Sequence, residues 1–470
     1  MLKIINNYNI LNSKEYKINK FEIKKNKIFN LIINIKNLFL LIILFFLFVL
    51  HCLSKNKLSY ENMIVNEPII PTNPGINDIL KIKNNSKYSF NYSHIRYHFQ
   101  NLYKNRKIFK INYSFFPYTK INKSISYEEN AKNIYDSTGI LNISKLDYYY
   151  NDIDINTLNL NHIHLSMAFD NNYIELASIS IASILNTSNL DTFIHFHILC
   201  LNFNFNDMEK LIKLKSINSN VDFIFYNAKQ AEYDFGYRGI KELRGIGNYA
   251  KILSPQIVNN TNKIIIMDSG DIIAQKDISE IFFFDLEDNY FGWILESVAG
   301  INSKTDMFWS NNFYPNAGIC LINVKLFRSD DLYQKAFFFA LSYNDLACPF
   351  QNILISISIY KFKYLPLKYN CRLFFDNDAQ IFNKTSPTNL MNEWMNEQKF
   401  SPYKYSIEEI KEAAFDPIIN HFYNFKIQNY NICNIFTVQW IKYSKMTGLY
   451  EQIKKKYPKP FECENITKKN

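Results

Sequence analysis

The chain has 470 residues, 47% of them hydrophobic and 16% aromatic, which is enough for a well-buried core in one large domain or two small ones. Its net charge of +10 comes largely from lysines that precede an apolar run. Lysines in that position mark membrane topology, and no nucleic-acid-binding motif is present, so nucleic-acid binding is not expected. Of the seven cysteines, Cys52 lies at the edge of the apolar run; the other six have no C-x-x-C spacing, which argues against a zinc site, and their even number permits disulfides without showing them.

Residues 38–53, LFLLIILFFLFVLHCL, form the first recognisable element. This run is slightly shorter than the roughly 20 residues that span a bilayer, but flanking residues extend it and Lys36 can snorkel to the interface. The lysine-rich residues 1–37 are expected to stay in the cytosol, which predicts a single-pass type II anchor with the rest of the chain in the Golgi or endoplasmic reticulum lumen. The alternative is a cleaved signal peptide; the long basic segment and the lack of a small-x-small cleavage site favour the anchor.

Three segments are expected after the anchor. Residues 54–160 are polar and aromatic with few aliphatic runs, and we expect a luminal stem with some local structure. Residues 161–430 alternate short apolar runs with helical patterns, which predicts an α/β fold whose central sheet contains parallel strands. Residues 431–470 are expected to hold an amphipathic helix, at 437–457, and a tail.

Within the central segment the elements follow in order. A helix at 174–185 carries its apolar residues on one face, and Asn206 is placed to cap a second helix. The expected strands are 163–169, 193–200, 221–226, 263–267, 290–295, 318–324 and 362–367.

Two of these strands end in an aspartate, Asp170 and Asp268. In an open α/β sheet, ligands bind beyond the carboxyl ends of the strands, so these carboxylates are candidate ligand-binding groups. A single aspartate at a strand end is more often a helix cap or a turn former, so each one alone is weak evidence.

The order and spacing of several blocks resemble glycosyltransferase family 8, over residues 160–430. The resemblance implies a nucleotide-diphospho-sugar transferase (GT-A type) fold with a Rossmann-like domain and a central mixed sheet. It also implies a UDP-sugar donor, retention of configuration at the sugar carbon and, usually, Mn²⁺. The blocks are AFDNNYIELASISIASILNTS (168–188), NYAKILSPQIVNNTNKIIIMDSGDIIAQKDISEIF (248–282), YPNAGICLINVKLFR (314–328), FQNILI (350–355), KYLPLKYN (363–370) and IINHF (418–422).

The resemblance implies metal ligands at Asp268, Asp271 and His421. Two carboxylates and an imidazole suit Mn²⁺ or another divalent cation, which would stabilise the charge that grows on a diphosphate leaving group. The family's Asp-x-Asp pair here reads Asp-Ser-Gly-Asp. Because Gly270 can adopt positive φ, a tighter turn could return Asp271 to the metal; the alternatives are a solvated turn carboxylate at Asp271 and a core histidine at His421.

The resemblance also implies donor contacts from Asp170, Tyr173, Lys251, Asn316 and Gly318. Asp170 and Tyr173 would recognise the nucleoside, with the tyrosine ring stacked on the base, although packing is an ordinary role for a tyrosine. Lys251 would reach the phosphates or the sugar, unless it is a solvated surface lysine. The Asn316–Gly318 segment would lie beside the donor sugar; taken alone, Asn-Ala-Gly indicates only a turn.

Gln351 matches a glutamine that lies beside the anomeric carbon in similar enzymes, and its carbonyl oxygen suits stabilisation of positive charge better than nucleophilic attack. The chain departs from the family here, because Phe350 replaces an aspartate that normally holds sugar hydroxyls, and Ile355 replaces an asparagine. After His421 the family's Gly and Lys-Pro-Trp are missing. Lys426, one residue early, is a candidate phosphate contact or a helix-face lysine.

The sequence therefore predicts a metal-dependent, retaining hexosyltransferase of the secretory pathway that uses a UDP-sugar. Its acceptor, a glycan, protein or lipid, is not indicated. The alternative is a degenerate relative that binds a nucleotide sugar or a partner without turnover, which the changes at Phe350, at the metal motif and after His421 favour.

Overall fold

The computed structural model describes residues 121, 124–151, 160–236, 247–295, 315–342, 349–358, 361–372, 388, 391–392, 395, 405–422 and 435–465. The chain divides into two units, Met1–Asn73 and Pro74–Asn470, and every described residue belongs to the second. The predicted cytosolic tail and anchor, residues 1–53, lie outside the described part. Among the described helices, none is both long and apolar enough to cross a membrane.

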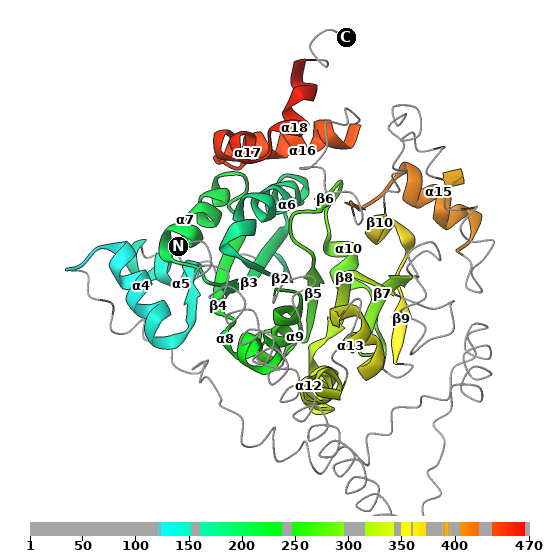
Figure 1. Cartoon of the computed structure of the whole chain (residues 1–470), viewed down its shortest axis with the longest axis horizontal. Helices are drawn as coiled ribbons and strands as arrows, with labels where there is room; N and C mark the ends of the chain where they lie inside the picture. Colours follow the sequence, from blue (N-terminus) through cyan, green and yellow to red (C-terminus); the bar gives the residue numbers. More distant parts are fainter. Residues whose placement is uncertain are drawn as a thin grey trace, which may run out of the picture. The chain divides into compact units, whose positions relative to one another are not determined.

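An eight-stranded mixed sheet forms the centre of the fold, in the order β1-β4-β3-β2-β5-β8-β7-β9 (Figure 1). The strands β4, β3, β2 and β5 run parallel, whereas β8 is antiparallel to both β5 and β7. The predicted α/β class and mixed central sheet are confirmed. The strands are β1 (Ile140–Asn142), β2 (Asn161–Asp170), β3 (Thr192–Leu201), β4 (Val221–Asn227), β5 (Lys263–Met267), β6 (Ile272–Ala274), β7 (Phe291–Leu295), β8 (Pro315–Asn323), β9 (Phe362–Tyr364), β10 (Cys371–Arg372) and β11 (Ile419–His421).

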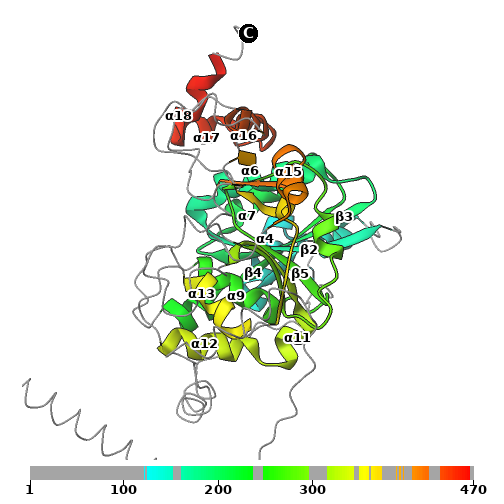
Figure 2. The same cartoon turned by 90° about the vertical axis from the view of Figure 1, so that its right-hand side faces the viewer.

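Helices cover both faces of this sheet, and the view in Figure 2 shows the same two layers from the side. On one face α6 and α7 pack over the strands and α16 packs on α6, whereas α9, α12 and α13 cover the other face. The helices are α4 (Tyr127–Thr138), α5 (Ile143–Asn151), α6 (Ile174–Thr187), α7 (Phe205–Ile212), α8 (Lys229–Ala231), α9 (Gly247–Ile257), α10 (Ser279–Phe283), α11 (Val324–Ser329), α12 (Leu332–Ser342), α13 (Pro349–Ser358), α15 (Ile407–Phe415), α16 (Ile435–Met446), α17 (Tyr450–Lys456) and α18 (Pro458–Phe461), with short turns η3 (Asn171–Tyr173), η4 (Lys213–Ser216), η5 (Glu232–Gly236), η8 (Leu367–Asn370) and η12 (Glu462–Asn465).

The strands that carry the candidate site are mostly apolar, as expected for strands whose two faces are both covered by helices. Every residue of β5 from Ile264 to Met267 is buried, and β2 is buried from Ile163 to Phe169. The predicted strands at 163–169, 193–200, 221–226 and 263–267 are confirmed to within two residues. The later strands are confirmed less closely, because β8 begins three residues before its predicted start and β9 ends at Tyr364.

The structured core begins before residue 161, where we expected the stem to end. The segment α4-β1-α5 packs beside the sheet, and β1 pairs antiparallel with β4, with Leu141 opposite Phe225. Gly139, at φ +73°, caps α4 and lets the chain turn directly into β1. The part of the predicted stem from Tyr127 to Asn151 therefore belongs to the folded domain, and its strand β1 forms one edge of the sheet.

Two helix predictions need correction. Asn204, not Asn206, caps α7, because its side chain and that of Asp207 exchange hydrogen bonds with each other's backbone N–H groups. The predicted helix at 437–457 is broken into α16 and α17 around Gly448, whose φ of +70° ends the first helix.

A second, three-stranded sheet has the order β10-β11-β6. β11 pairs antiparallel with β6, so that His421 lies opposite Ile272, and parallel with β10, so that Asn420 lies opposite Cys371. No local pattern predicted this sheet. It joins three segments that are far apart in the sequence, directly beside the carboxyl end of β5.

Four histidines, which the sequence reasoning did not single out, stack on neighbouring strands. His164 and His195 are paired in register on β2 and β3, and their rings lie parallel with centroids 4.5 Å apart. The ring nitrogens of His162 and His195 lie 2.9 Å apart, as do those of His164 and His197, and His197 also bonds to the hydroxyl of Tyr226. Burial, together with His195 and His162, lowers the pKa of His164 to about 3, and burial lowers the pKa of His197 well below its usual value.

These lowered pKa values predict a protein that loses stability in mild acid. Below the ordinary histidine pKa of about 6.5 the unfolded chain takes up protons that folded His164 and His197 do not. The contribution of these two histidines to the free energy of unfolding is therefore fully present above pH 6.5. It falls, by up to about 1.4 kcal/mol per pH unit for each histidine, as the pH drops towards 3. Urea unfolding followed by tryptophan fluorescence at pH 7 and pH 5, above the carboxylate range, measures this slope.

The variant His164→Phe keeps an aromatic ring in the stack and removes one titrating group, so its slope between pH 7 and 5 is expected to be shallower. His162→Phe is the graded comparison: burial and His195 also lower the pKa of His162, but His162 is exposed at the end of the same stack, so its removal is expected to change the slope less. Identical slopes in the wild type and His164→Phe would contradict this account.

Candidate active site

Asp268 directly follows β5 at the carboxyl edge of the parallel strands. Its backbone N–H donates to the carbonyl of Gly318 on β8, at 2.8 Å, so the turn begins in a fixed place. β2 is the parallel neighbour of β5 and ends at Asp170, which therefore lies at the same edge of the sheet. The prediction that both aspartates lie at one sheet edge is confirmed.

The turn from Asp268 to Asp271 depends on Gly270 and on α6. Gly270 has φ +90°, a region that L side chains rarely adopt, and an added Cβ would lie 2.7 Å from the Cβ of Leu176. The Oγ of Ser180 accepts the N–H of Gly270 at 3.1 Å and donates to the carbonyl of Ile272 at 2.7 Å. The predicted tight turn at Gly270 is confirmed, and it returns Asp271 towards Asp268.

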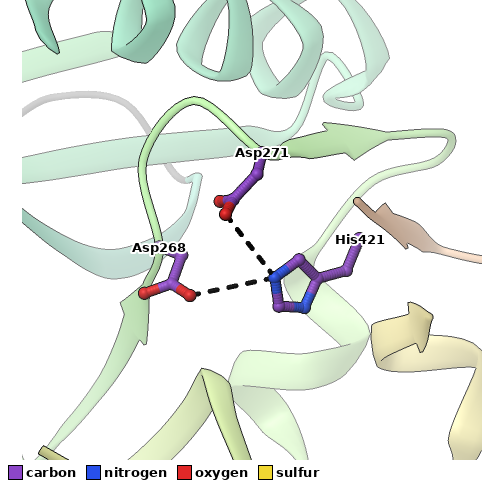
Figure 3. Close-up of side chains that lie close together, drawn as sticks. All are labelled: Asp268, Asp271 and His421. Carbon is purple, nitrogen blue, oxygen red and sulfur yellow. Dashed lines mark ion pairs between the residues drawn. The ribbon is translucent and has the colours of Figure 1, made fainter. Parts of the chain in front are cut away.

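His421 reaches the same place from β11. The N–H of Phe422 donates to the carbonyl of Asp271 at 2.7 Å, which ties β11 to the end of the turn. Figure 3 shows the imidazole facing both carboxylates, with Nε2 3.8 Å from Oδ2 of Asp268 and 3.9 Å from Oδ2 of Asp271. These separations are too long for hydrogen bonds. One ligand atom of each residue lies within 4.8 Å of the other two, and no second such group occurs in the described part of the chain.

The imidazole of His421 is held on its other side by polar groups. Its Nδ1 lies 2.9 Å from Oδ1 of Asn370, whose Nδ2 donates to Oδ1 of Asn316 at 2.9 Å. Gly318 leaves room for the ring, because a Cβ there would lie 2.2 Å from Cε1 of His421. The backbone close approach that Gly318 permits is therefore to His421, within the protein itself.

Lys251 on α9 is only 2% exposed and pairs with Oδ1 of Asp268. Its ammonium also lies 5.4 Å from the ring centre of Phe350, a cation–π distance. The alternative of a solvated surface lysine is therefore excluded. The two oxygens of Asp268 are divided, with Oδ1 on Lys251 and Oδ2 facing His421.

Asp170 and Tyr173 lie at the end of β2. Oδ1 of Asp170 accepts the N–H of Asn172 at 2.9 Å, which is a capping role, and Tyr173 is 48% exposed, so its ring is not committed to the core. Lys456 on α17 reaches this turn, donating to the carbonyl of Asn172 at 2.8 Å and to Glu175 at 2.9 Å. The sequence reasoning missed Lys456 because nothing local links residue 456 to residue 172.

Gln351 on α13 donates through Nε2 to the carbonyl of Pro315, next to Asn316. It is buried beside the start of β8, on the same side of the sheet as Lys251 and Phe350. Lys426 lies outside the described residues.

The cluster of Asp268, Asp271 and His421 fits a divalent cation by its chemistry. It combines two carboxylates and an imidazole, a donor set suited to Mn²⁺. With Lys251 the side-chain charge is about −1 when His421 is neutral, so a doubly charged ion is compensated rather than opposed. The predicted meeting of these three side chains is confirmed.

A family model, glycosyl transferase family 8, matches residues 164–404, just over half of the chain. This chain belongs to glycosyl transferase family 8. By family it is a glycosyltransferase, a class of enzyme that transfers sugars. His421 lies beyond the matched range, so its place beside the strand-end aspartates is a finding of the structure.

Several known proteins are similar to this chain. A lipopolysaccharide 1,2-glucosyltransferase of Escherichia coli is 24% identical over 242 residues, which are 49% of this chain and 68% of that protein. The bifunctional glycosyltransferase WbbM has a TM-score of 0.49 and 16% identity, over 65% of this chain and 52% of that one, so this chain spans about half its length. The galactosyltransferase LgtC, solved with donor and acceptor sugar analogs, has a TM-score of 0.47 and 18% identity; the match covers 61% of this chain and 95% of LgtC.

Gly318→Ala is expected to weaken divalent-metal binding. The new methyl group would displace the His421 ring, and disturbing the groups that orient a metal ligand lowers affinity by roughly 10- to 100-fold. Titration of Mn²⁺ into the full chain, followed by the electron paramagnetic resonance of the free ion, measures the dissociation constant.

Gly292→Ala on β7 is the matched control. Its Cβ would meet the side-chain ends of Leu286 and Leu365 at 2.7 and 2.9 Å, and neither leucine belongs to the cluster of Asp268, Asp271 and His421. We expect this variant to be less stable but to bind Mn²⁺ as the wild type does. Equal Mn²⁺ affinity in Gly318→Ala and Gly292→Ala would refute the role given to Gly318.

Proposed function

We propose that the chain transfers a hexose or a related sugar from a UDP-sugar to an acceptor, with retention of configuration and with a divalent cation such as Mn²⁺. The observation that carries this proposal is the meeting of Asp268, Asp271 and His421 at the carboxyl edge of the parallel strands. The membership of glycosyl transferase family 8 supports sugar transfer as the reaction. The proposed GT-A type of the fold agrees with the mixed sheet.

Asp268, Asp271 and His421 would hold the cation, which when bound supplies positive charge to a diphosphate leaving group. Lys251 adds a second, fixed positive charge next to Asp268. Because Lys251 is buried and paired, it is already oriented before the donor arrives, and this lowers the reorganisation needed in the reaction. Both charges would stabilise the diphosphate oxygens as the bond between sugar and phosphate breaks.

The remaining donor contacts follow from the same edge of the sheet. Asp170 and the exposed ring of Tyr173 would bind the nucleoside, with the ring stacked on the base. Gln351 is the candidate catalytic residue; its amide is anchored on Pro315, and its carbonyl oxygen would stabilise positive charge at the anomeric carbon. Asn316 would lie at the sugar, and Lys426 is kept as a candidate phosphate contact.

A luminal location is part of the proposal. The apolar run at residues 38–53 would anchor the chain as a type II membrane protein, with this domain in the Golgi or endoplasmic reticulum lumen. Cys463 is disulfide-bonded, which supports the same side of the membrane, since disulfides persist in oxidising compartments. The acceptor would be a glycan, a protein or a lipid.

The second candidate is a relative that binds a nucleotide sugar or a partner without turnover. Phe350 favours it, because this residue is buried against Lys251 where the resemblance leads us to expect a carboxylate. Under this candidate UDP with Mn²⁺ raises the melting temperature of the protein while no sugar is released from any donor.

The proposal predicts Mn²⁺-dependent release of UDP when the full chain is given UDP-glucose, UDP-galactose, UDP-xylose or UDP-glucuronate in turn. Asp271→Asn is expected to lower the rate with the active donor by on the order of 100-fold or more, because the metal loses a charged ligand. Asp268→Asn also leaves Lys251 buried without its carboxylate partner, which destabilises the fold. For this variant the loss of rate is therefore compared with the loss of stability.

Asp288→Asn is the matched control, because Asp288 is an exposed aspartate in a turn outside the cluster. It should keep the wild-type rate. Equal turnover in Asp271→Asn and Asp288→Asn would contradict the assignment of Asp271 as a metal ligand. Binding of UDP and Mn²⁺ without any turnover would favour the second candidate.

Lys456→Ala is expected to weaken UDP binding about two- to fivefold, the size of a partly exposed ion pair, because it frees the turn that carries Tyr173. Isothermal titration calorimetry, with UDP added to the protein in the presence of Mn²⁺, measures the affinity for UDP. Lys455→Ala, one residue earlier on the exposed side of α17, is the control and should bind UDP normally. If both variants bind UDP as tightly as the wild type, α17 has no part in the nucleotide site.

A further inference from the structure

A chain of three buried hydrogen bonds runs from β8 to His421. The N–H of Gly318 donates to Oδ1 of Asn316 at 2.9 Å, and Nδ2 of Asn370 donates to the same oxygen, also at 2.9 Å. Oδ1 of Asn370 then lies 2.9 Å from Nδ1 of His421. The side chains are almost fully enclosed: Asn316 is 1% exposed, and Asn370 and His421 are 0% exposed.

The direction of every bond in this chain follows from its first member. A backbone N–H can only donate, so the Asn316 atom that meets it is the amide oxygen. An amide oxygen can only accept, so Asn370 presents its NH₂ group to Asn316 and turns its own oxygen to His421. That oxygen needs a donor, and so the hydrogen of the neutral imidazole lies on Nδ1.

The consequence appears at the other ring nitrogen. With the hydrogen on Nδ1, Nε2 keeps its lone pair, and Nε2 is the atom that faces Asp268 and Asp271 at 3.8 and 3.9 Å. The two negative charges alone would favour the opposite tautomer, because an N–H at Nε2 would turn its positively polarised hydrogen towards them. That tautomer has no lone pair for a cation between the three residues.

We propose that Asn316 and Asn370 are positioning residues that hold His421 in the tautomer with hydrogen on Nδ1 and so keep Nε2 as a ligand for a divalent cation. This inference rests on the metal binding of the proposed function. It gives Asn316 a task inside the protein, whereas the resemblance led us to expect only a contact with the donor sugar.

The tautomer is measured first in the unmodified full chain. In protein labelled with ¹⁵N-histidine and free of metal, magic-angle-spinning nuclear magnetic resonance distinguishes a protonated from an unprotonated ring nitrogen. The signal of His421 is assigned as the one lost in His421→Gln. We expect a protonated Nδ1 and an unprotonated Nε2; a protonated Nε2 would overturn the proposal, whatever any variant does.

Two variants then remove the groups that set the tautomer, one in contact with the His421 ring and one a hydrogen bond further away. Asn370→Leu removes the acceptor for Nδ1. Asn316→Leu leaves the acceptor for Nδ1 in place but removes the oxygen that orients Asn370, so the Asn370 amide can rotate and present its NH₂ group to Nδ1. We expect Mn²⁺ affinity, measured by electron paramagnetic resonance in the absence of donor, to fall roughly 10- to 100-fold in both variants.

A conservative variant separates positioning from mere packing. Asn316→Asp keeps an oxygen for the N–H of Gly318 and for the NH₂ group of Asn370, so Asn370 stays oriented. We expect it to retain an unprotonated Nε2 and Mn²⁺ affinity within a few fold of the wild type, rescuing what Asn316→Leu loses. Leucine variants that fold and bind Mn²⁺ like the wild type would overturn the proposal.

The outcome is independent of sugar transfer. Normal Mn²⁺ binding and the expected tautomer, without release of sugar from any donor, would contradict the proposed transfer reaction and leave the positioning role intact. The reverse result is also possible to distinguish. If the wild type transfers sugar but Asn316→Leu binds Mn²⁺ normally, the positioning role is contradicted and the proposed reaction stands.

Discussion

The antiparallel pairing of β11 with β6 is the contact on which the candidate site depends. β6 begins one residue after Asp271, and β11 ends at His421, which lies opposite Ile272. A slip of one residue would turn His421 to the other face of the small sheet, away from both aspartates. β10 adds to the same constraint, because it follows Asn370 directly and pairs with β11 in parallel, which brings the partner of Nδ1 alongside the ring.

The sequence was sufficient for the parts of this site that are local. The apolar run of β5, the aspartate that ends it and the positive φ of Gly270 are properties of a few neighbouring residues, and each prediction about them is confirmed. The small sheet was not predictable in this way, because β6, β10 and β11 are short and their pairing depends on contacts between distant segments. For the same reason the reach of Lys456 to Asn172 and the place of β1 in the sheet carried no local pattern.

Gly318 shows how a correctly chosen residue can have a different physical role. A glycine on a strand indicates that something approaches the backbone closely, but the residue type does not say what approaches. The space is filled by the ring of His421, which is contributed by a segment about a hundred residues later. The stacked histidines of β2 and β3 were overlooked for the opposite reason. Alternating histidines within two apolar strands look like ordinary sheet positions until the register sets their rings face to face.

The substitution at Phe350 changes the electrostatics around Lys251 more than it changes the metal cluster. A carboxylate at this position would lie within reach of the Lys251 ammonium and would compete for it with Asp268. With a phenyl ring there, the ammonium is left to Asp268 and gains a cation–π contact, so one oxygen of Asp268 is neutralised while the other still faces His421. Of the departures from the family within the described residues, the longer Asp-Ser-Gly-Asp turn keeps Asp271 close to Asp268, and the change at Phe350 falls beside Lys251. Asp268, Asp271 and His421 lie together, and Asn370 contacts the imidazole at Nδ1. A chain that had lost only its metal chemistry would be expected to lose the fully buried Asn370 and His421 first, because buried polar side chains are costly to keep without a use.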